Sequence, residues 1–236
     1  MNVKFIAVND TTSLLKDNWR QIWITPFKRQ RLITGSLIML IVVIMLPFFF
    51  GYIEKRPGLL LNDWVLAQLP AHNESVLIFA IIWGMILLIF IRAIYNPSIY
   101  ITYCWTYIFV CLVRIVTISL VPLAPPTGFI PLTDPLTSIF YGHAVITKDL
   151  FFSGHTATLT LIALCLERKT DKLAAFAATV IVAFLLLVQH VHYTIDILAA
   201  PIIVYALYLV TRHFLYKTKK SPQPKAAVSE VYSIDK

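Results

Sequence analysis

The sequence predicts an all-α fold: a six-transmembrane helix bundle with both termini in the cytoplasm. Of its 236 residues, 58% are hydrophobic and only 14% are charged, whereas soluble domains contain roughly 45–50% apolar and about 25% charged residues. Six separate stretches also approach the length of about 20 mostly apolar residues that a spanning helix needs. A water-soluble core cannot hold this surplus of apolar residues, so we expect a multi-pass membrane protein.

The predicted spans divide the chain into three parts. A polar N-terminal segment covers residues 1–31, the membrane domain covers 32–214, and a basic tail that we expect to be disordered covers 215–236. The fourth and fifth spans are joined by the short polar segment ERKTDK, so we expect them to pack as an antiparallel pair. The six spans are residues 32–52, 75–95, 99–121, 150–167, 172–190 and 195–214.

The N-terminal segment has two possible structures. We find no cleavable signal peptide in it, because it is mixed polar and ends in the basic run FKRQR. It can form an amphipathic helix on the membrane surface, or a cytoplasmic tail with some contact to the bundle. Its apolar residues Leu14, Leu15, Trp19, Ile22 and Trp23 are interspersed with Lys16, Arg20 and Lys28.

The basic residues predict the orientation in the membrane. With the N-terminus in the cytoplasm, 16 of the 20 Lys and Arg residues fall on the cytoplasmic side and three on the opposite, exoplasmic side, while Arg114 lies within the third span. Cytoplasmic loops carry such an excess of Lys and Arg in membrane proteins. Topology and anionic lipid therefore explain the net charge of +8, and we expect no nucleic-acid partner.

Two histidine motifs meet on the predicted exoplasmic side. His155 begins the fourth span with Ser153, Gly154 and Thr156, which suit a helix N-terminus where free N–H groups favour an anion. His192 and Asp196 are four residues apart, so on one helix they would share a face. Asp196 could then accept a hydrogen bond from one ring nitrogen of His192 and orient the other as base or nucleophile.

This pairing is suited to phosphoryl transfer. One histidine can attack phosphorus in line while the other protonates the departing oxygen, and neither step requires a metal or another cofactor. Arg114 could reach a lipid phosphate, because a guanidinium matches phosphate oxygens in bidentate fashion. A structural ion pair of Arg114 with Asp149 or Asp134 is the alternative. Lys148 and Asp149 are further candidates for substrate contact, although a surface ion pair explains them equally well.

Several other residues have simpler explanations. His190 points away from His192 if both are helical, which favours capping or packing over a ligand role. A metal site from His190, His192, Asp196 and His155 lacks a cysteine or further carboxylate to complete its shell. The three cysteines all fall in predicted spans, without disulfide or metal-ligand spacing. His72 and His143 are expected in solvated loops.

The segments FFSGHT (151–156) and HYTID (192–196) together resemble the paired signature of the sphingomyelin synthase family. This family is a branch of the type 2 phosphatidic acid phosphatase superfamily. LVRIVTISLVPLAPP (112–126) is similar to its arginine-containing third span, and RPGLLLNDWVLAQLP (56–70) more loosely resembles its first exoplasmic loop. Lys148 stands where the family usually has glycine.

The resemblance implies an enzyme that moves a phosphorylated head group from a glycerophospholipid to ceramide and releases diacylglycerol. His192 would be the nucleophile that forms a phosphohistidine, and Asp196 would orient it. His155 would protonate diacylglycerol and then deprotonate the ceramide hydroxyl. The membrane and these lipids are the expected partners. Choline, ethanolamine and inositol phosphate all remain possible as head groups.

The phosphatase branch of the superfamily carries cationic residues that this chain lacks. The lysine of its Lys-x6-Arg-Pro element would fall at Phe49, and its Ser-Arg pair before the second histidine would fall at Leu185 and Leu186. Its Pro-Ser-Gly-His reads Phe152-Ser153-Gly154-His155 here. These differences favour a transferase, whose phosphodiester donor carries one negative charge, over a phosphatase for a monoester dianion.

Two alternatives to the transferase are a lipid phosphatase or phospholipase C-like hydrolase, and a transporter or scaffold that reuses the fold. The short tails and the Ile- and Lys-rich composition favour a bacterial inner membrane with a periplasmic active site. In a eukaryote, the Golgi or plasma membrane would be expected.

Overall fold

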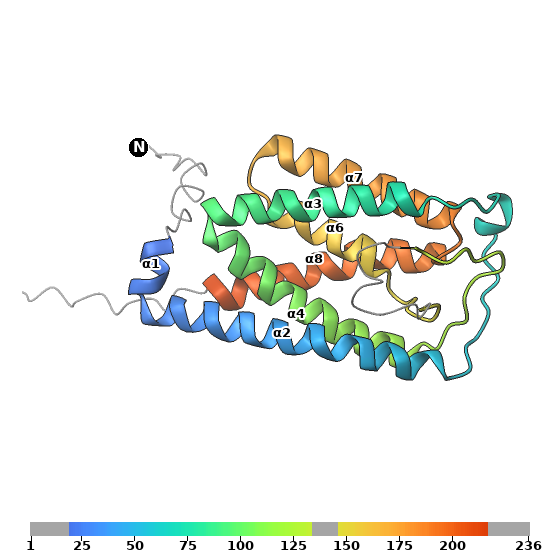
Figure 1. Ribbon diagram of the computed structural model, residues 1–236, viewed down its shortest axis with the longest axis horizontal. Helices are drawn as coiled ribbons and strands as arrows, with labels where there is room; N and C mark the ends of the chain where they lie inside the picture. The colour runs from blue at the N-terminus through green and yellow to red at the C-terminus, as the bar shows by residue number, and fades with distance from the viewer. Residues whose placement is uncertain (1–18, 134–145, 217–236) are drawn as a thin grey trace, which may run out of the picture.

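The computed structural model describes residues 19–133 and 146–216, and this part of the chain consists of helices and connecting loops, without a β-strand (Figure 1). His143 and Asp134 lie outside the described residues, as do residues 1–18 and 217–236 of the two terminal segments. The part of the chain that the structure describes contains seven α-helices and one short 3₁₀ turn: α1 (Trp19–Ile24), α2 (Pro26–Glu54), η3 (Leu66–Gln68), α3 (Ser75–Tyr95), α4 (Pro97–Leu120), α6 (Gly154–Cys165), α7 (Lys169–Val188) and α8 (Thr194–Tyr216).

The long helices run side by side and place the connecting segments at two opposite ends (Figure 1). One end, which we call the loop end, holds residues 55–74, 121–133, 146–153 and 189–193. The other, the basic end, holds α1, the turns after α3 and α6, and the end of α8. Helix α6 is central, because it contacts α3, α4, α7 and α8.

Within the described ranges, five helices are long and apolar enough to cross a membrane: α2, α3, α4, α7 and α8. Their outward faces carry exposed large hydrophobic side chains such as Phe48, Leu173 and Ile202. Soluble monomers rarely expose contiguous apolar surface on this scale, so these faces suit contact with lipid. The structure supports a multi-pass membrane protein, while the side of the membrane that each terminus occupies stays a prediction.

The fourth predicted span is shorter than expected. Residues 150–153 are not helical, and α6 contains only the 12 residues Gly154–Cys165, about 18 Å at 1.5 Å per residue. The difference arises because the preceding segment turns along α4, where Arg114 and Thr117 donate hydrogen bonds to its carbonyl oxygens. Non-helical backbone at membrane depth is tolerated where protein covers it, and Leu150, Phe152 and Leu159 are all buried.

Helix α1, Thr25 and the first six residues of α2 are the described part of the predicted N-terminal segment, because α2 begins at Pro26 rather than at residue 32. Helix α1 is six residues long and ends before Pro26, the first residue of α2. Ile22 is buried, and the indole N–H of Trp19 donates to the carbonyl oxygen of Ile94 at 2.8 Å, whereas Trp23 is exposed. This short helix therefore contacts the bundle with one face and leaves an aromatic residue on the other.

A close approach joins α2 to α4 at Gly35. A Cβ atom at this position would lie 2.8 Å from Nε1 of Trp105, and that nitrogen is held by its hydrogen bond to the carbonyl oxygen of Arg31 at 3.1 Å. Gly51, also in α2, has nothing within 4 Å of such an atom. Glycine at position 35 thus lets the indole pack against the backbone of α2.

We expect Gly35→Val to lower the Tm of the detergent-solubilised protein by about 3–10 °C, because overpacking costs roughly 1–3 kcal/mol and each kcal/mol shifts Tm by about 2–4 °C at this size. Gly51→Val is the matched control in the same helix and should change the Tm little. Thermal unfolding followed by tryptophan fluorescence measures both. An equal loss in the two variants would show that the Gly35–Trp105 approach is not limiting.

Candidate active site

The first motif forms the start of α6. Ser153 is the N-cap residue, and its hydroxyl oxygen accepts a hydrogen bond from the amide of Thr156 at 3.4 Å. Ser residues at this position satisfy one of the free N–H groups of a helix start. The cap places His155 in the first turn, where its ring packs edge-on against Phe79 with centroids 6.0 Å apart.

The second motif lies at the junction of α7 and α8 and is not a continuous helix. His192 precedes Thr194, the first residue of α8, by two residues, while Asp196 is in the first turn. The expectation that both share a helical face is therefore wrong. A turn separates them because the Asp196 carboxylate accepts the amide of Tyr193 at 3.0 Å, as a capping group would.

The His192–Asp196 pair is nevertheless close and buried. Nδ1 of His192 lies 3.5 Å from Oδ2 of Asp196, and the two side chains are 2% and 0% exposed. The contact does not have the geometry of a hydrogen bond, since Nδ1 of His192 and Oδ1 of Asp196 both lack such a partner within the described residues. Buried polar groups without a hydrogen-bond partner are costly.

The fold brings the two motifs together. The ring centroids of His155 and His192 are 6.3 Å apart, with an interplanar angle of 65°. A backbone hydrogen bond links the two segments, from the amide of Ser153 to the carbonyl oxygen of Asp196 at 3.2 Å. A phosphoryl group that reacts with both rings would lie about 3–3.5 Å from the reacting atom of each. The separation of the two rings is compatible with these distances.

Arg114 lies against the start of α6. Its Nε donates to the carbonyl oxygen of Phe152 at 3.0 Å, and its Nη2 forms an ion pair with Asp149. A Cβ atom on Gly154 would collide with the guanidinium, so glycine is needed for this approach. The ion pair with Asp149 is the alternative noted from the sequence, and the neighbouring guanidinium still adds positive charge beside His155.

The side chain of Lys148 is bonded to the end of α2. Its ammonium donates to the carbonyl oxygens of Glu54, at 2.7 Å, and Arg56, at the end of α2, and the Glu54 carboxylate accepts the Lys148 amide at 3.2 Å. These bonds anchor the segment before α6 to α2. A substrate-binding role for Lys148 therefore stays a prediction without a contact that supports it, whereas Ser153, Gly154 and Thr156 flank His155 at the start of α6.

Asp63 supports the histidine site and was not identified from the sequence. Its carboxylate accepts the amide of Thr194 at 2.7 Å and the hydroxyl of the same residue at 3.1 Å. It thereby holds the first residue of α8, between His192 and Asp196. Oδ1 of Asp63 also accepts hydrogen bonds from the amides of Val65 and Leu66. Only these local bonds had a signal in the sequence, which is an Asp before a short turn.

Residues 189–193 bind the remaining loops. Both ring nitrogens of His190 contact backbone carbonyl oxygens, Nδ1 that of Thr127 at 2.8 Å and Nε2 that of Leu69 at 3.0 Å. The Tyr193 hydroxyl donates to the carbonyl oxygen of Ala124 at 2.9 Å, and Gln189 donates to Ser75 at 2.8 Å. The segment that carries His192 is thus held on several sides. Across residues 19–133 and 146–216, no three His, Cys, Asp or Glu side chains are grouped to hold a metal ion.

The hydrogen bonds of Asp63 predict a pH-dependent contribution to stability. Burial alone would raise its pKa, but the bonds from Thr194, Leu66 and Val65 lower it below the ordinary value of 3.8. The stabilisation is therefore present above that value and is lost as the pH falls through the lower pKa of the folded state.

We expect Asp63→Asn to lower the Tm by a few degrees at pH 7, since the amide cannot accept all of these bonds. The difference from the wild type should shrink as the pH falls below about 4, toward the lower pKa at which the folded wild-type carboxyl becomes protonated. Tm measured against pH for both proteins tests this. A difference that is constant between pH 7 and pH 3 would mean that the ionised carboxylate does not stabilise α8.

Comparison with known proteins supports one superfamily for the segment that carries both histidine motifs. Residues 146–214 match the family described as PAP2 superfamily C-terminal, a group of type 2 phosphatidic acid phosphatases and related enzymes. No curated protein shows a significant match to the chain. The match covers His155, His192 and Asp196 together with all of α6 and α7 and most of α8.

Proposed function

We propose that this protein transfers a phosphorylated head group from a glycerophospholipid to ceramide, releasing diacylglycerol and forming a sphingophospholipid. The observation that carries the proposal is the approach of His155 and His192, 6.3 Å between ring centroids, with Asp196 buried behind His192. The superfamily match supports the general chemistry, and the resemblance of residues 112–126 and 148–156 to sphingomyelin synthases supports ceramide as acceptor.

The proposal gives each ring a role. Nδ1 of His192 faces Asp196, so Nε2 is the atom that attacks phosphorus. The bond from phosphorus to the diacylglycerol oxygen breaks, and His155 donates a proton to that oxygen. In the second half-reaction, His155 takes the proton from the ceramide hydroxyl, which attacks the phosphohistidine and frees His192. Asp196 stabilises the positive charge on the His192 ring during both steps.

The charges around the rings favour a phosphodiester substrate. Arg114 is the cation beside the start of α6, and its charge is shared with Asp149, while Lys148 is bonded to the end of α2. A phosphodiester carries a single negative charge and needs fewer cations than a monoester dianion. The site is at the end of the bundle that has few basic residues, which is consistent with an exoplasmic location under the positive-inside rule.

Acceptor dependence distinguishes the transferase from a hydrolase. Purified protein with head-group-labelled glycerophospholipid should yield labelled sphingophospholipid and diacylglycerol only when ceramide is added. Thin-layer separation of the lipids, and counting of the aqueous phase, measure both products. Rapid release of label into water without ceramide would favour the lipid phosphatase or phospholipase C-like reaction, and no turnover of any donor head group would contradict an enzymatic role.

Substitutions in the histidine pair test the assigned roles. We expect His192→Ala to abolish turnover and Asp196→Asn to lower kcat by several orders of magnitude, as for orienting aspartates elsewhere. His72→Ala, a change at an exposed histidine of the same loop end, is the matched control and should retain activity. Near-normal rates in Asp196→Asn, with an unchanged Tm, would refute the role of that carboxylate.

A further inference from the structure

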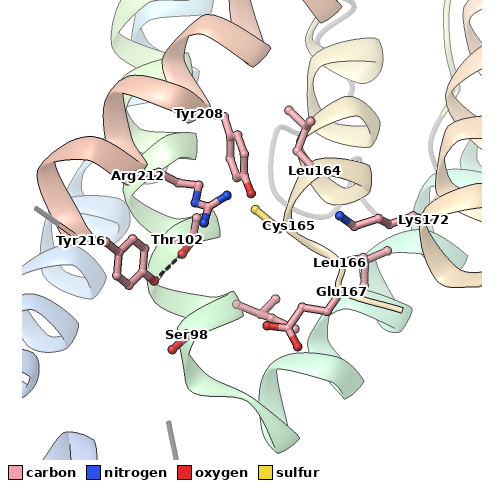
Figure 2. A pocket seen from close by; sticks show the side chains of 11 residues that line it. Ser98, Thr102, Leu164, Cys165, Leu166, Glu167, Lys172, Tyr208, Arg212 and Tyr216 are labelled. Atoms are coloured by element: carbon pink, nitrogen blue, oxygen red, sulfur yellow. Dashed lines mark hydrogen bonds between the residues drawn. The ribbon is translucent and has the colours of Figure 1, made fainter. Parts of the chain in front are cut away.

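A second candidate site lies at the basic end, at the opposite end of α6 from the histidines. A cavity of about 360 Å³ opens between α4, the α6–α7 turn and α8 (Figure 2). Cys165, the last residue of α6, lines it, whereas His155 is in the first turn of the same helix. Ten residues at 1.5 Å each separate the two by roughly 15 Å along the axis, so the cavity is not part of the histidine site.

Two cations reach this cavity from different helices. The guanidinium of Arg212 in α8 and the ammonium of Lys172 in α7 point toward the same space from opposite sides (Figure 2). Within the described residues, neither has a carboxylate at ion-pair distance. Arg212 is supported by Tyr208, over whose ring the guanidinium lies at 5.6 Å from the centroid. Like charges that face one empty space favour an anion between them.

The other lining groups neutralise this charge only in part. The carboxylate of Glu167 also lines the cavity, but its Oε1 accepts a hydrogen bond from the side-chain amide of Asn96 at 2.8 Å. The helix dipoles nearly cancel, because the first turns of α4 and α7 and the last turns of α6 and α8 all meet here. The side chains therefore determine the net charge of the site, which is positive because two cations face one anion.

The rest of the wall suits a ligand that is part polar and part apolar. The Tyr208 hydroxyl points into the cavity beside the sulfur of Cys165 (Figure 2). Tyr216 and Thr102 share a hydrogen bond of 2.8 Å at one edge. Ile99 and Leu166 provide buried apolar surface. Basic pockets between membrane helices bind anionic lipid head groups in this way.

We propose that this cavity binds a phosphate group whose negative charge is not balanced within the ligand, as in the head group of an anionic glycerophospholipid or in free phosphate. Arg212 and Lys172 bind the phosphate oxygens, and the Tyr208 hydroxyl donates to one of them. The site takes its ligand at the end of the bundle opposite to the proposed catalytic histidines, and its occupancy does not depend on turnover.

The test is lipid binding to the full-length protein, measured by native mass spectrometry after release from detergent micelles. Dioleoylphosphatidylglycerol should bind more tightly than dioleoylphosphatidylcholine, whose choline balances its phosphate. Arg212→Gln and Lys172→Gln should each weaken binding of phosphatidylglycerol about tenfold or more, since each removes a charge-assisted contact. Lys169→Gln is the matched control, because Lys169 is an exposed cation in the first turn of α7 that does not line the cavity.

Inorganic phosphate, added as a competitor, separates the two sources of the ligand. If millimolar phosphate displaces phosphatidylglycerol from the wild type but not from Arg212→Gln, the site is assigned to free phosphate. Retention of the lipid would assign it to a head group held with its acyl chains. Equal binding of the two lipids, unchanged binding in both variants, or an equal loss in Lys169→Gln would overturn the proposal. None of these measurements requires catalysis, so they test the phosphate site independently of the proposed ceramide reaction.

Discussion

The amide of Ser153 donates a hydrogen bond to the carbonyl oxygen of Asp196 at 3.2 Å, and the arrangement of the loop end depends on this contact. It joins the residue that caps α6 to the first turn of α8. His155 follows the first partner by two residues, and His192 precedes the second by four. Ser153 and Asp196 are both buried, so the bond is protected from water, and hydrogen bonds inside a protein are electrostatically stronger than in water.

The surroundings of this bond show how polar loops are held above an apolar bundle. Buried backbone groups need hydrogen-bond partners, and the segment around His192 obtains them from distant parts of the chain. Asp63 binds the start of α8, the Tyr193 hydroxyl reaches Ala124, and the His190 ring contacts Thr127. The histidine that we propose as nucleophile therefore lies on a short segment whose neighbours are all restrained, as pre-organised chemistry requires.

The two ends of helix α6 lie at two sites with different chemistry. Its N-terminal turn carries His155 beside Arg114, and its C-terminal residue lines a cavity into which Arg212 and Lys172 point. Both ends thus present positive charge where phosphate-bearing lipids would meet the protein, but with different chemistry. The loop end has the two imidazoles to which we assign proton transfer and a covalent step, whereas the basic end combines two cations with hydroxyls and the Glu167 carboxylate, for which we propose binding without reaction.

The positions of the long helices followed closely from the sequence, because apolar length is a local property. The start of α6 did not follow, because the four residues before Gly154 are apolar enough to extend a helix but are held by Arg114 and Thr117. The same reasoning applies to Asp196, whose spacing from His192 is helical although a turn separates them.

The sequence by itself determined the helical class, the membrane character and the identity of the two histidine motifs. These depend on composition, on the length of apolar stretches and on residues within a few positions of one another. Only the tertiary structure decided how far His155 lies from His192, that Lys148 bonds to the end of α2 and that Asp63 holds α8. Each of these is a contact between segments distant in the chain, and which polar group satisfies which is settled only when the helices pack.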